Sequence, residues 1–108
     1  SMLQKQQRLT TKEFDHYYQT GRRLHGQYVG IIYNPSDEFH GAVVVGKKVF
    51  SKAHDRNRMR RRLYGILYAQ KVAKSAKGVY IVLVKPTAKN APYQAVRDEL
   101  TSLLTKLS

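Results

Sequence analysis

The 108-residue sequence contains no cysteine and no tryptophan. Without cysteine the chain can form neither a disulfide framework nor a thiolate zinc site, and this absence is typical of a cytosolic protein. Long apolar runs are also missing: the longest, residues 79–84, is far too short to span a bilayer, and the N-terminus lacks the apolar core of a signal peptide. We therefore predict a cytoplasmic protein with no membrane partner, and we interpret Ser1-Met2 as a cloning remnant.

Acidic residues are scarce. The chain has 7 Asp and Glu residues and 20 Lys and Arg residues, which gives a formal net charge of +13. A charge of this size repels itself and weakens the compact state, so it is typical of a protein with a polyanionic partner. Nucleic acid is the first candidate, and an anionic membrane surface is the second. Hydrophobic residues make up 42% of the chain, which is enough for the core of one domain over residues 1–108.

Capping residues and hydrophobic periodicity predict three helices and three strands. Thr10 and Glu13 fit a capping box ahead of a helix over residues 11–20, a long helix covers residues 51–74, and Pro92 opens the last helix. Residues 24–33 and 41–49 read as strands joined by turn residues 34–37, which predicts an antiparallel hairpin. Residues 78–85 are apolar at both odd and even positions, which is typical of a central strand covered on both faces. The prediction is an α+β fold of order α-β-β-α-β-α, with helices packed on a mainly antiparallel sheet.

The stretch AHDRNRMRRRLYG, residues 53–65, concentrates five arginines in about two turns of the long helix. On a helical wheel the apolar residues Met59, Leu63, Ile66 and Leu67 fall on the side that should meet the sheet. Arg58, Arg61 and Arg62 point away from that stripe, and Arg60, Tyr64 and Tyr68 follow one flank. The helix thus separates a core face from an arginine face.

The counter-charge for this arginine face must come from outside the chain. A solvated helix face normally alternates charges, yet Asp55 is the only acid between Phe39 and Val96. The planar arginine fork binds phosphate oxygens in pairs, and a membrane-bound helix would need its apolar stripe for lipid. Lys47, Lys48 and Lys52 add to the charge just before the helix. We predict polyanion binding, with RNA as the ligand.

These residues resemble the protein subunit of bacterial ribonuclease P. The family signature, Arg-Asn-Arg followed by an apolar residue and two basic ones, stands here as Arg56-Asn57-Arg58-Met59-Arg60-Arg61. Further matches are Arg8-Leu9, Phe14, Tyr18, Gly21 and Gly46-Lys47-Lys48, so that the resemblance covers nearly the whole chain. Tyr64 and Gly65 replace a usual basic–acidic pair, and Leu67 replaces a usual aromatic.

The resemblance implies a fold, a function and a set of contacts. It implies a further short strand near residues 22–26 and a left-handed strand–helix–strand crossover. The protein would bind the ribonuclease P RNA and the 5′ leader of precursor tRNA, and so promote endonucleolytic formation of the mature 5′ end by a catalytic RNA that needs magnesium. No catalytic residue, bound metal or cofactor, and no obligate protein partner, is expected of the protein itself. The RNA-binding residues would be Lys47, Lys48, Lys52, Arg56, Asn57, Arg58, Arg60, Arg61 and Arg62, and the leader-binding cleft would comprise Phe14 and Tyr18, with Val29 and Ile31 as possible floor.

Two other functions compete with this one. An autonomous ribonuclease would need an acid–base pair, for which the sequence offers Glu13–His16 and a pairing of His25 with His40 across the predicted hairpin; His54 is the remaining histidine. The carboxylate pairs Asp37–Glu38 and Asp98–Glu99 do not resemble a two-metal site. A generic RNA-binding or ribosome-associated protein is the alternative that composition leaves open.

Overall fold

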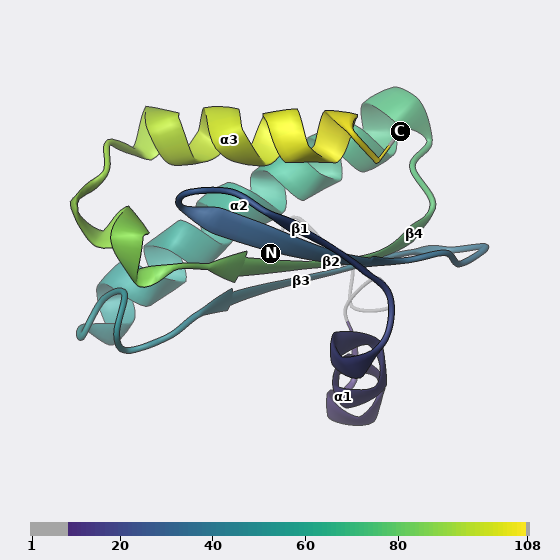
Figure 1. The fold of residues 1–108 in the computed structure, drawn as a ribbon, viewed down its shortest axis with the longest axis horizontal. Helices are drawn as coiled ribbons and strands as arrows, with labels where there is room; N and C mark the ends of the chain where they lie inside the picture. The colour runs from purple at the N-terminus through teal and green to yellow at the C-terminus, as the bar shows by residue number, and fades with distance from the viewer. Residues whose placement is uncertain (1–8, 108) are drawn as a thin grey trace.

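The computed structural model describes residues 9–107, so Ser1, Met2 and Arg8 lie outside the described part of the chain. In chain order the elements are α1 (Thr11–Gln19), β1 (Arg22–His25), β2 (Val29–Asn34), β3 (Phe39–Val45), α2 (Ala53–Lys74), β4 (Gly78–Val84), the 3-10 helix η2 (Pro86–Asn90) and α3 (Tyr93–Thr105) (Figure 1). The predicted α+β class is confirmed, with the short extra strand β1 present.

The four strands form one sheet in the order β1-β2-β4-β3. β2 pairs antiparallel with β1 and β4, whereas β3 and β4 pair in parallel and are joined by α2. α2 and α3 lie on one face of the sheet, and α1 lies on the other (Figure 1). The sheet is therefore mainly antiparallel, as predicted, and it separates the arginine-rich helix from α1.

The predicted hairpin between residues 24–33 and 41–49 is wrong. The first of these segments bends at residues 26–28 and forms its own hairpin, β1–β2, while β4 inserts between β2 and β3. The physical reason lies in β4, whose side chains are apolar on both faces and in which every residue except Leu83 is buried. Such a strand needs a neighbour on each side and a cover on each face, so it takes the position next to β2.

The helices begin and end close to the predicted positions. The capping box at Thr10 and Glu13 is present, and α2 begins at Ala53 after Lys52. Pro92 is the N-cap of α3 and not part of its first turn. The 3-10 helix η2 was not predicted, because a five-residue segment such as PTAKN is too short to show helical periodicity.

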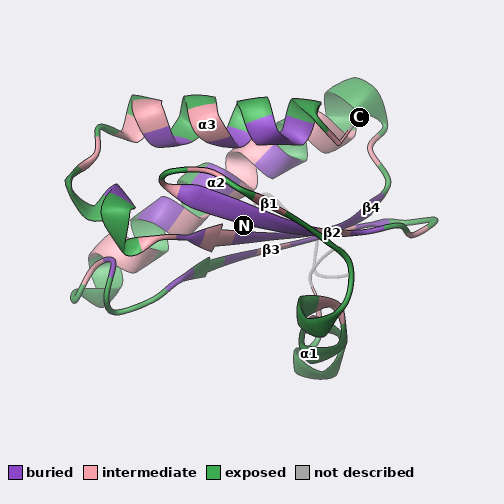
Figure 2. Cartoon of the chain, viewed as in Figure 1, coloured by how far each residue is buried: buried purple, intermediate pink, exposed green. Residues whose placement is uncertain are grey.

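The main core fills the space between the sheet and helices α2 and α3. Figure 2 shows buried residues along the strands and on the sides of both helices that face the sheet. The α2 contribution is Met59, Leu63 and Leu67, while Ile66 is only partly buried. A smaller cluster of Ile32, Val79 and Ile81 lies on the opposite face, where Leu9, Phe14 and Tyr17 of the α1 segment pack against it.

A single carboxylate ties α3 to the turn between β1 and β2. Oε1 of Glu99 accepts a hydrogen bond from the backbone N–H of Gln27, and Oε2 accepts from Tyr28 and Val29 at 2.7 and 2.9 Å. Lys85 supports the same turn by donating from Nζ to the carbonyl of Gly26 at 2.6 Å. The acidic pair in the last helix thus has a structural role at Glu99.

Candidate nucleic-acid interface

Most of the sequence-predicted RNA-binding residues are exposed and close together along the chain. β3 ends at Val45, and the following turn and the first turns of α2 carry them. We call the exposed members the arginine surface: Lys47, Lys48, Lys52, Asn57, Arg58, Arg61 and Arg62. The amphipathic spacing predicted from sequence is therefore real, since Met59 and Leu63 between these arginines are buried against the sheet.

Arg56 and Arg60 are half-buried and hold local contacts. Nη1 of Arg56 donates to the carbonyls of Phe50 and Ser51 at 3.0 and 2.8 Å, which fixes the turn before α2. Nη2 of Arg60 donates to Oδ1 of Asn57. Asn57 therefore has a hydrogen-bond partner within α2. Arg56 therefore stabilises the turn that carries the lysines.

No carboxylate neutralises the arginine surface within the described residues. Across residues 9–107 the ion pairs join Glu38 to His40 and Asp98 to Arg97, and both lie outside that surface. Within residues 9–107 no ion pair offsets the mutual repulsion of its cations. A polyanion that supplies phosphates at this surface would relieve the repulsion and gain charge-assisted hydrogen bonds.

Arg62 has an aromatic partner that the sequence did not reveal. Its guanidinium carbon lies 4.4 Å from the ring centroid of Tyr93, the first residue of α3. Stacking of this kind holds the guanidinium plane in one orientation while its edge can still donate hydrogen bonds. The two residues are far apart in sequence, so only the packing of α3 beside α2 brings them together.

On the other face of the sheet, α1 presents a second aromatic and basic cluster. The rings of Phe14 and Tyr18 stack with centroids 5.7 Å apart, and the guanidinium of Arg23 lies 5.1 Å from the Tyr18 ring. Arg23 also donates to the carbonyl of Tyr18. Tyr18 is 40% exposed, whereas Phe14 is partly buried against the small cluster under α1. Of the two stacked rings, that of Tyr18 is therefore the more accessible to a ligand.

Two polar features fix α1 in this position. Buried Asn34 donates from Nδ2 to the carbonyls of Tyr17 and Thr20 at 3.2 and 3.3 Å, so the end of α1 is anchored to β2. At the other end, hydrogen bonds from the backbone N–H and the side chain of Thr10 hold the pKa of Glu13 below its usual value. The aromatic cluster therefore rests on a short helix that is anchored to β2 at its C-terminal end and capped at its N-terminal end.

Val29 and Ile31 do not form the floor of a cleft beside Tyr18, and that prediction is wrong. Both side chains are fully buried in the main core, on the face covered by α2 and α3. The strand β2 has apolar residues at both odd and even positions, so its sequence did not show which residues face α1. On the face that carries α1, the accessible apolar side chains come from β3 and β4: Val44 is 37% exposed, and Ala42 and Leu83 are partly buried.

The two histidines of one predicted acid–base pair, His25 and His40, lie on different strands of the sheet. His25 is on β1 and His40 is on β3, the two opposite edges of the sheet, so the predicted proximity of these histidines is wrong. No group of three or more His, Asp or Glu side chains in residues 9–107 is placed to hold a metal ion. None of the helices described combines the length and the apolar character that a membrane span requires.

Comparison with known proteins decides the family. The sequence profile described as Ribonuclease P matches residues 3–108. The chain belongs to this family. The "Ribonuclease P protein component" of Phytoplasma australiense is 31% identical to it over 75 residues, which are 69% of this chain. The protein of the same name from Onion yellows phytoplasma (strain OY-M) is 30% identical over 89 residues, which are 79% of this chain. The matches span 64% and 62% of those two relatives, less than two thirds of their length.

Solved structures agree on the fold of this ribonuclease P family member. The RNase P protein of Staphylococcus aureus superimposes with a TM-score of 0.80 at 21% identity, covering 94% of this chain and 95% of that one. A mutant of the same S. aureus protein, described as defective in mRNA degradation activity, superimposes with a TM-score of 0.79 at 22% identity, covering 95% and 89% of the two chains. At these identities the likeness shows a shared fold.

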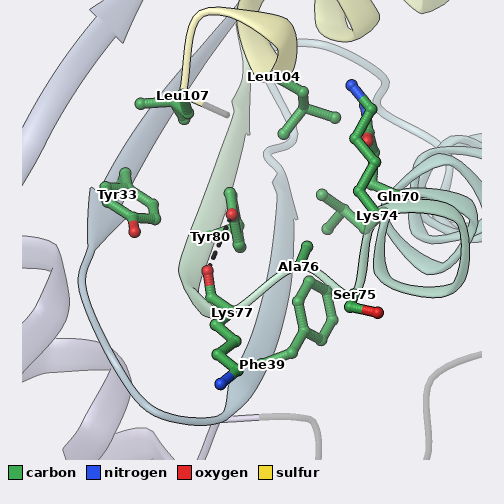
Figure 3. Close-up of a pocket in the computed structure, with 11 residues that line it drawn as sticks. Tyr33, Phe39, Gln70, Lys74, Ser75, Ala76, Lys77, Tyr80, Leu104 and Leu107 are labelled. Carbon is green, nitrogen blue, oxygen red and sulfur yellow. Dashed lines mark hydrogen bonds between the residues drawn. The ribbon is translucent and has the colours of Figure 1, made fainter.

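Outside the surfaces to which the ribonuclease P resemblance pointed, the chain has an aromatic cavity of about 370 Å³ near the C-terminal ends of α2 and α3 (Figure 3). Tyr33, Phe39 and Tyr80 line it, and the hydroxyl of Tyr80 donates to the carbonyl of Lys77 at 3.0 Å. Burial, and to a lesser degree the nearby Tyr33, raise the pKa of Tyr80. The amino groups of Lys74 and Lys77 point away from the cavity (Figure 3). This space is an apolar end of the core and lacks the convergent charge of the arginine surface.

Proposed function

We propose that the chain is the protein component of a bacterial ribonuclease P. In this role it binds the ribonuclease P RNA and the 5′ leader of precursor tRNA in the cytoplasm, and the RNA cleaves the leader endonucleolytically to form the mature tRNA 5′ end. The observation that carries the proposal is the arginine surface, whose cations have no carboxylate partner within residues 9–107 and which contains the family's basic motif. Family membership supports the choice of RNA.

The chemistry in this proposal belongs to the RNA. The protein supplies charge and shape, and no side chain of it acts as nucleophile, acid or base. Two polyanions, the catalytic RNA and the precursor, must approach each other, and the cations of the protein lower the repulsion between them. Magnesium is required by the RNA-catalysed reaction, and the protein reduces how much of it is needed.

A magnesium titration tests this function. Cleavage of a precursor tRNA by a ribonuclease P RNA should reach half of its maximal rate at a lower magnesium concentration when the purified protein is present. The reason is that protein cations replace part of the ion atmosphere around the RNAs. A generic basic RNA-binding protein of similar charge serves as the control and should give a smaller shift. Superimposable titrations with and without the chain would refute the proposal in favour of the generic RNA-binding alternative.

The second part of the proposal concerns the leader. We propose that Tyr18 stacks on an unpaired leader base, that Phe14 supports it, and that the accessible apolar residues Ala42, Val44 and Leu83 continue this surface over the sheet. Tyr18 is exposed, and Arg23 beside it can bind the adjacent phosphate while remaining on the ring. Stacking tolerates any base, which suits a leader of variable sequence.

Replacing Tyr18 with alanine should weaken the binding of precursors that carry several leader nucleotides by roughly 5- to 150-fold, because one stacked base contributes about 1–3 kcal/mol. The affinity for mature tRNA should not change. Binding is measured with the assembled RNA–protein complex over a series of leader lengths. Tyr68→Ala is the matched control, since Tyr68 is 38% exposed but lies on α2. Equal losses for precursor and mature tRNA would show that Tyr18 supports the fold and not the leader.

A further inference from the structure

A groove of about 270 Å³ lies between the first turns of α2 and the segment that leads from η2 into α3. We call it the α2–α3 groove. Its walls carry two aromatic rings, three cations and one carboxylate: Phe50, Tyr93, Arg58, Arg62, Lys89 and Asp55. The volume lies just below the usual range of pockets for drug-sized ligands, which suits a single planar ring system with a phosphate at the mouth.

The aromatic and basic walls of the groove suit a nucleotide. Tyr93 already stacks with the guanidinium of Arg62 at 4.4 Å, so a flat and polarisable surface is oriented before any ligand arrives. Phe50, from the turn before α2, adds a second ring to the lining. Arg58 and Lys89 are exposed, and they come from different elements, α2 and η2. A base can therefore stack while its phosphate is held by charge.

Asp55 is the residue that gives the groove selectivity. It is half-buried in the first turn of α2, and it forms no ion pair with Arg58 or Arg62 in the structure of residues 9–107, although all three line the same groove. A carboxylate repels phosphate, so in an anion-binding groove it is suited to a different part of the ligand. It accepts hydrogen bonds only, and it matches a base edge that donates them.

Among the RNA bases, guanine presents two adjacent donors, the N1–H and the exocyclic amino group, to the two oxygens of a carboxylate. Cytosine and adenine have one amino group next to an acceptor nitrogen, and uracil has one N–H between two carbonyls. We propose that the α2–α3 groove binds one unpaired guanine nucleotide of the partner RNA, with the base against Tyr93 and Asp55 and the phosphate on Arg58 and Lys89. This inference rests on the proposed function for the source of the guanine, and it adds Asp55, Lys89 and Tyr93 to the interface.

The test uses the full chain and short, unstructured RNAs. Binding of UUGUU and UUUUU is followed by amide chemical shifts, with 5′-GMP and 5′-UMP titrated in parallel. We expect UUGUU to bind about fivefold or more tightly than UUUUU, as a bidentate base contact allows, and to shift the signals of Phe50, Asp55 and Tyr93. A preference for GMP without a preference for UUGUU would assign the groove to a free nucleotide and overturn the proposal.

Variants separate base recognition from charge. Asp55→Asn should abolish the preference for guanine while UUUUU binds at least as well as before, because a negative charge has been removed. Asp98→Asn, the same change on the exposed side of α3, should leave the preference intact. Equal affinities of the unmodified chain for UUGUU and UUUUU would refute the guanine site. The magnesium titration does not depend on these oligonucleotides, so the guanine site and the ribonuclease P role can fail separately.

Discussion

Replacing Arg58 and Arg61 together with alanine should weaken the binding of the chain to a ribonuclease P RNA by about 100-fold. Both guanidinium groups are exposed on α2, and neither has a carboxylate partner within residues 9–107. A hydrogen bond to a charged group contributes about 1.5 kcal/mol or more, and about 1.4 kcal/mol corresponds to a factor of ten in affinity. Two such losses therefore account for the expected effect.

The salt dependence of binding identifies the partner of these arginines. Each lost phosphate contact should reduce the steepness of the slope of log affinity against log salt by about 0.7–0.9. The slope of the double variant should therefore be reduced by nearly twice that amount. The control is Arg97→Ala combined with Lys106→Ala, which removes two exposed cations from α3 and its C-terminal end. Affinity and slope equal to those of the unmodified chain in Arg58→Ala/Arg61→Ala would exclude this face of α2 from the interface.

The arginine surface was predictable because helical periodicity places residues on faces. Once Met59 and Leu63 are assigned to the core, the exposure of Arg58 and Arg61 follows from the spacing of 3.6 residues per turn. The same rule does not say which exposed side chains find partners inside the protein. Arg56 is close in sequence to Arg58, yet its guanidinium binds the carbonyls of Phe50 and Ser51.

The sheet was harder to predict, because strand pairing is decided by competition between distant segments. The turn residues after β2 suggested a hairpin with β3, but β4 gains more from a central position and takes the place beside β2. The same ambiguity misplaced Val29 and Ile31: a strand that is apolar on both faces shows no alternation from which the core face can be read. The contacts of Arg62 with Tyr93 and of Glu99 with the β1–β2 turn depend on where α3 packs, which local patterns do not specify.

Glu99→Ala should lower the free energy of unfolding by about 3 kcal/mol, the largest single effect on stability that we expect. The carboxylate of Glu99 accepts hydrogen bonds from three backbone N–H groups of the β1–β2 turn, and alanine would leave all three without that acceptor. A lost hydrogen bond to a charged group costs about 1.5–3 kcal/mol, and partial access of water to this turn keeps the total below the sum of three. Asp98→Ala, the neighbouring exposed carboxylate, should change stability by less than about 0.5 kcal/mol.

Glu99→Gln distinguishes the hydrogen-bond geometry from mere packing. Glutamine keeps the shape of the side chain, but it has one acceptor oxygen and one NH₂ group. Because Oε1 accepts from Gln27 and Oε2 from Tyr28 and Val29, either orientation of the amide turns its NH₂ towards a backbone donor. The close fit adds to the cost, since a Cβ at Gly26 would lie 2.4 Å from the Glu99 carboxyl carbon and the turn therefore has little room to shift. Urea denaturation should thus place Glu99→Gln at roughly half of the loss caused by alanine or more. A glutamine variant as stable as the unmodified chain would show that the side chain acts only by filling space.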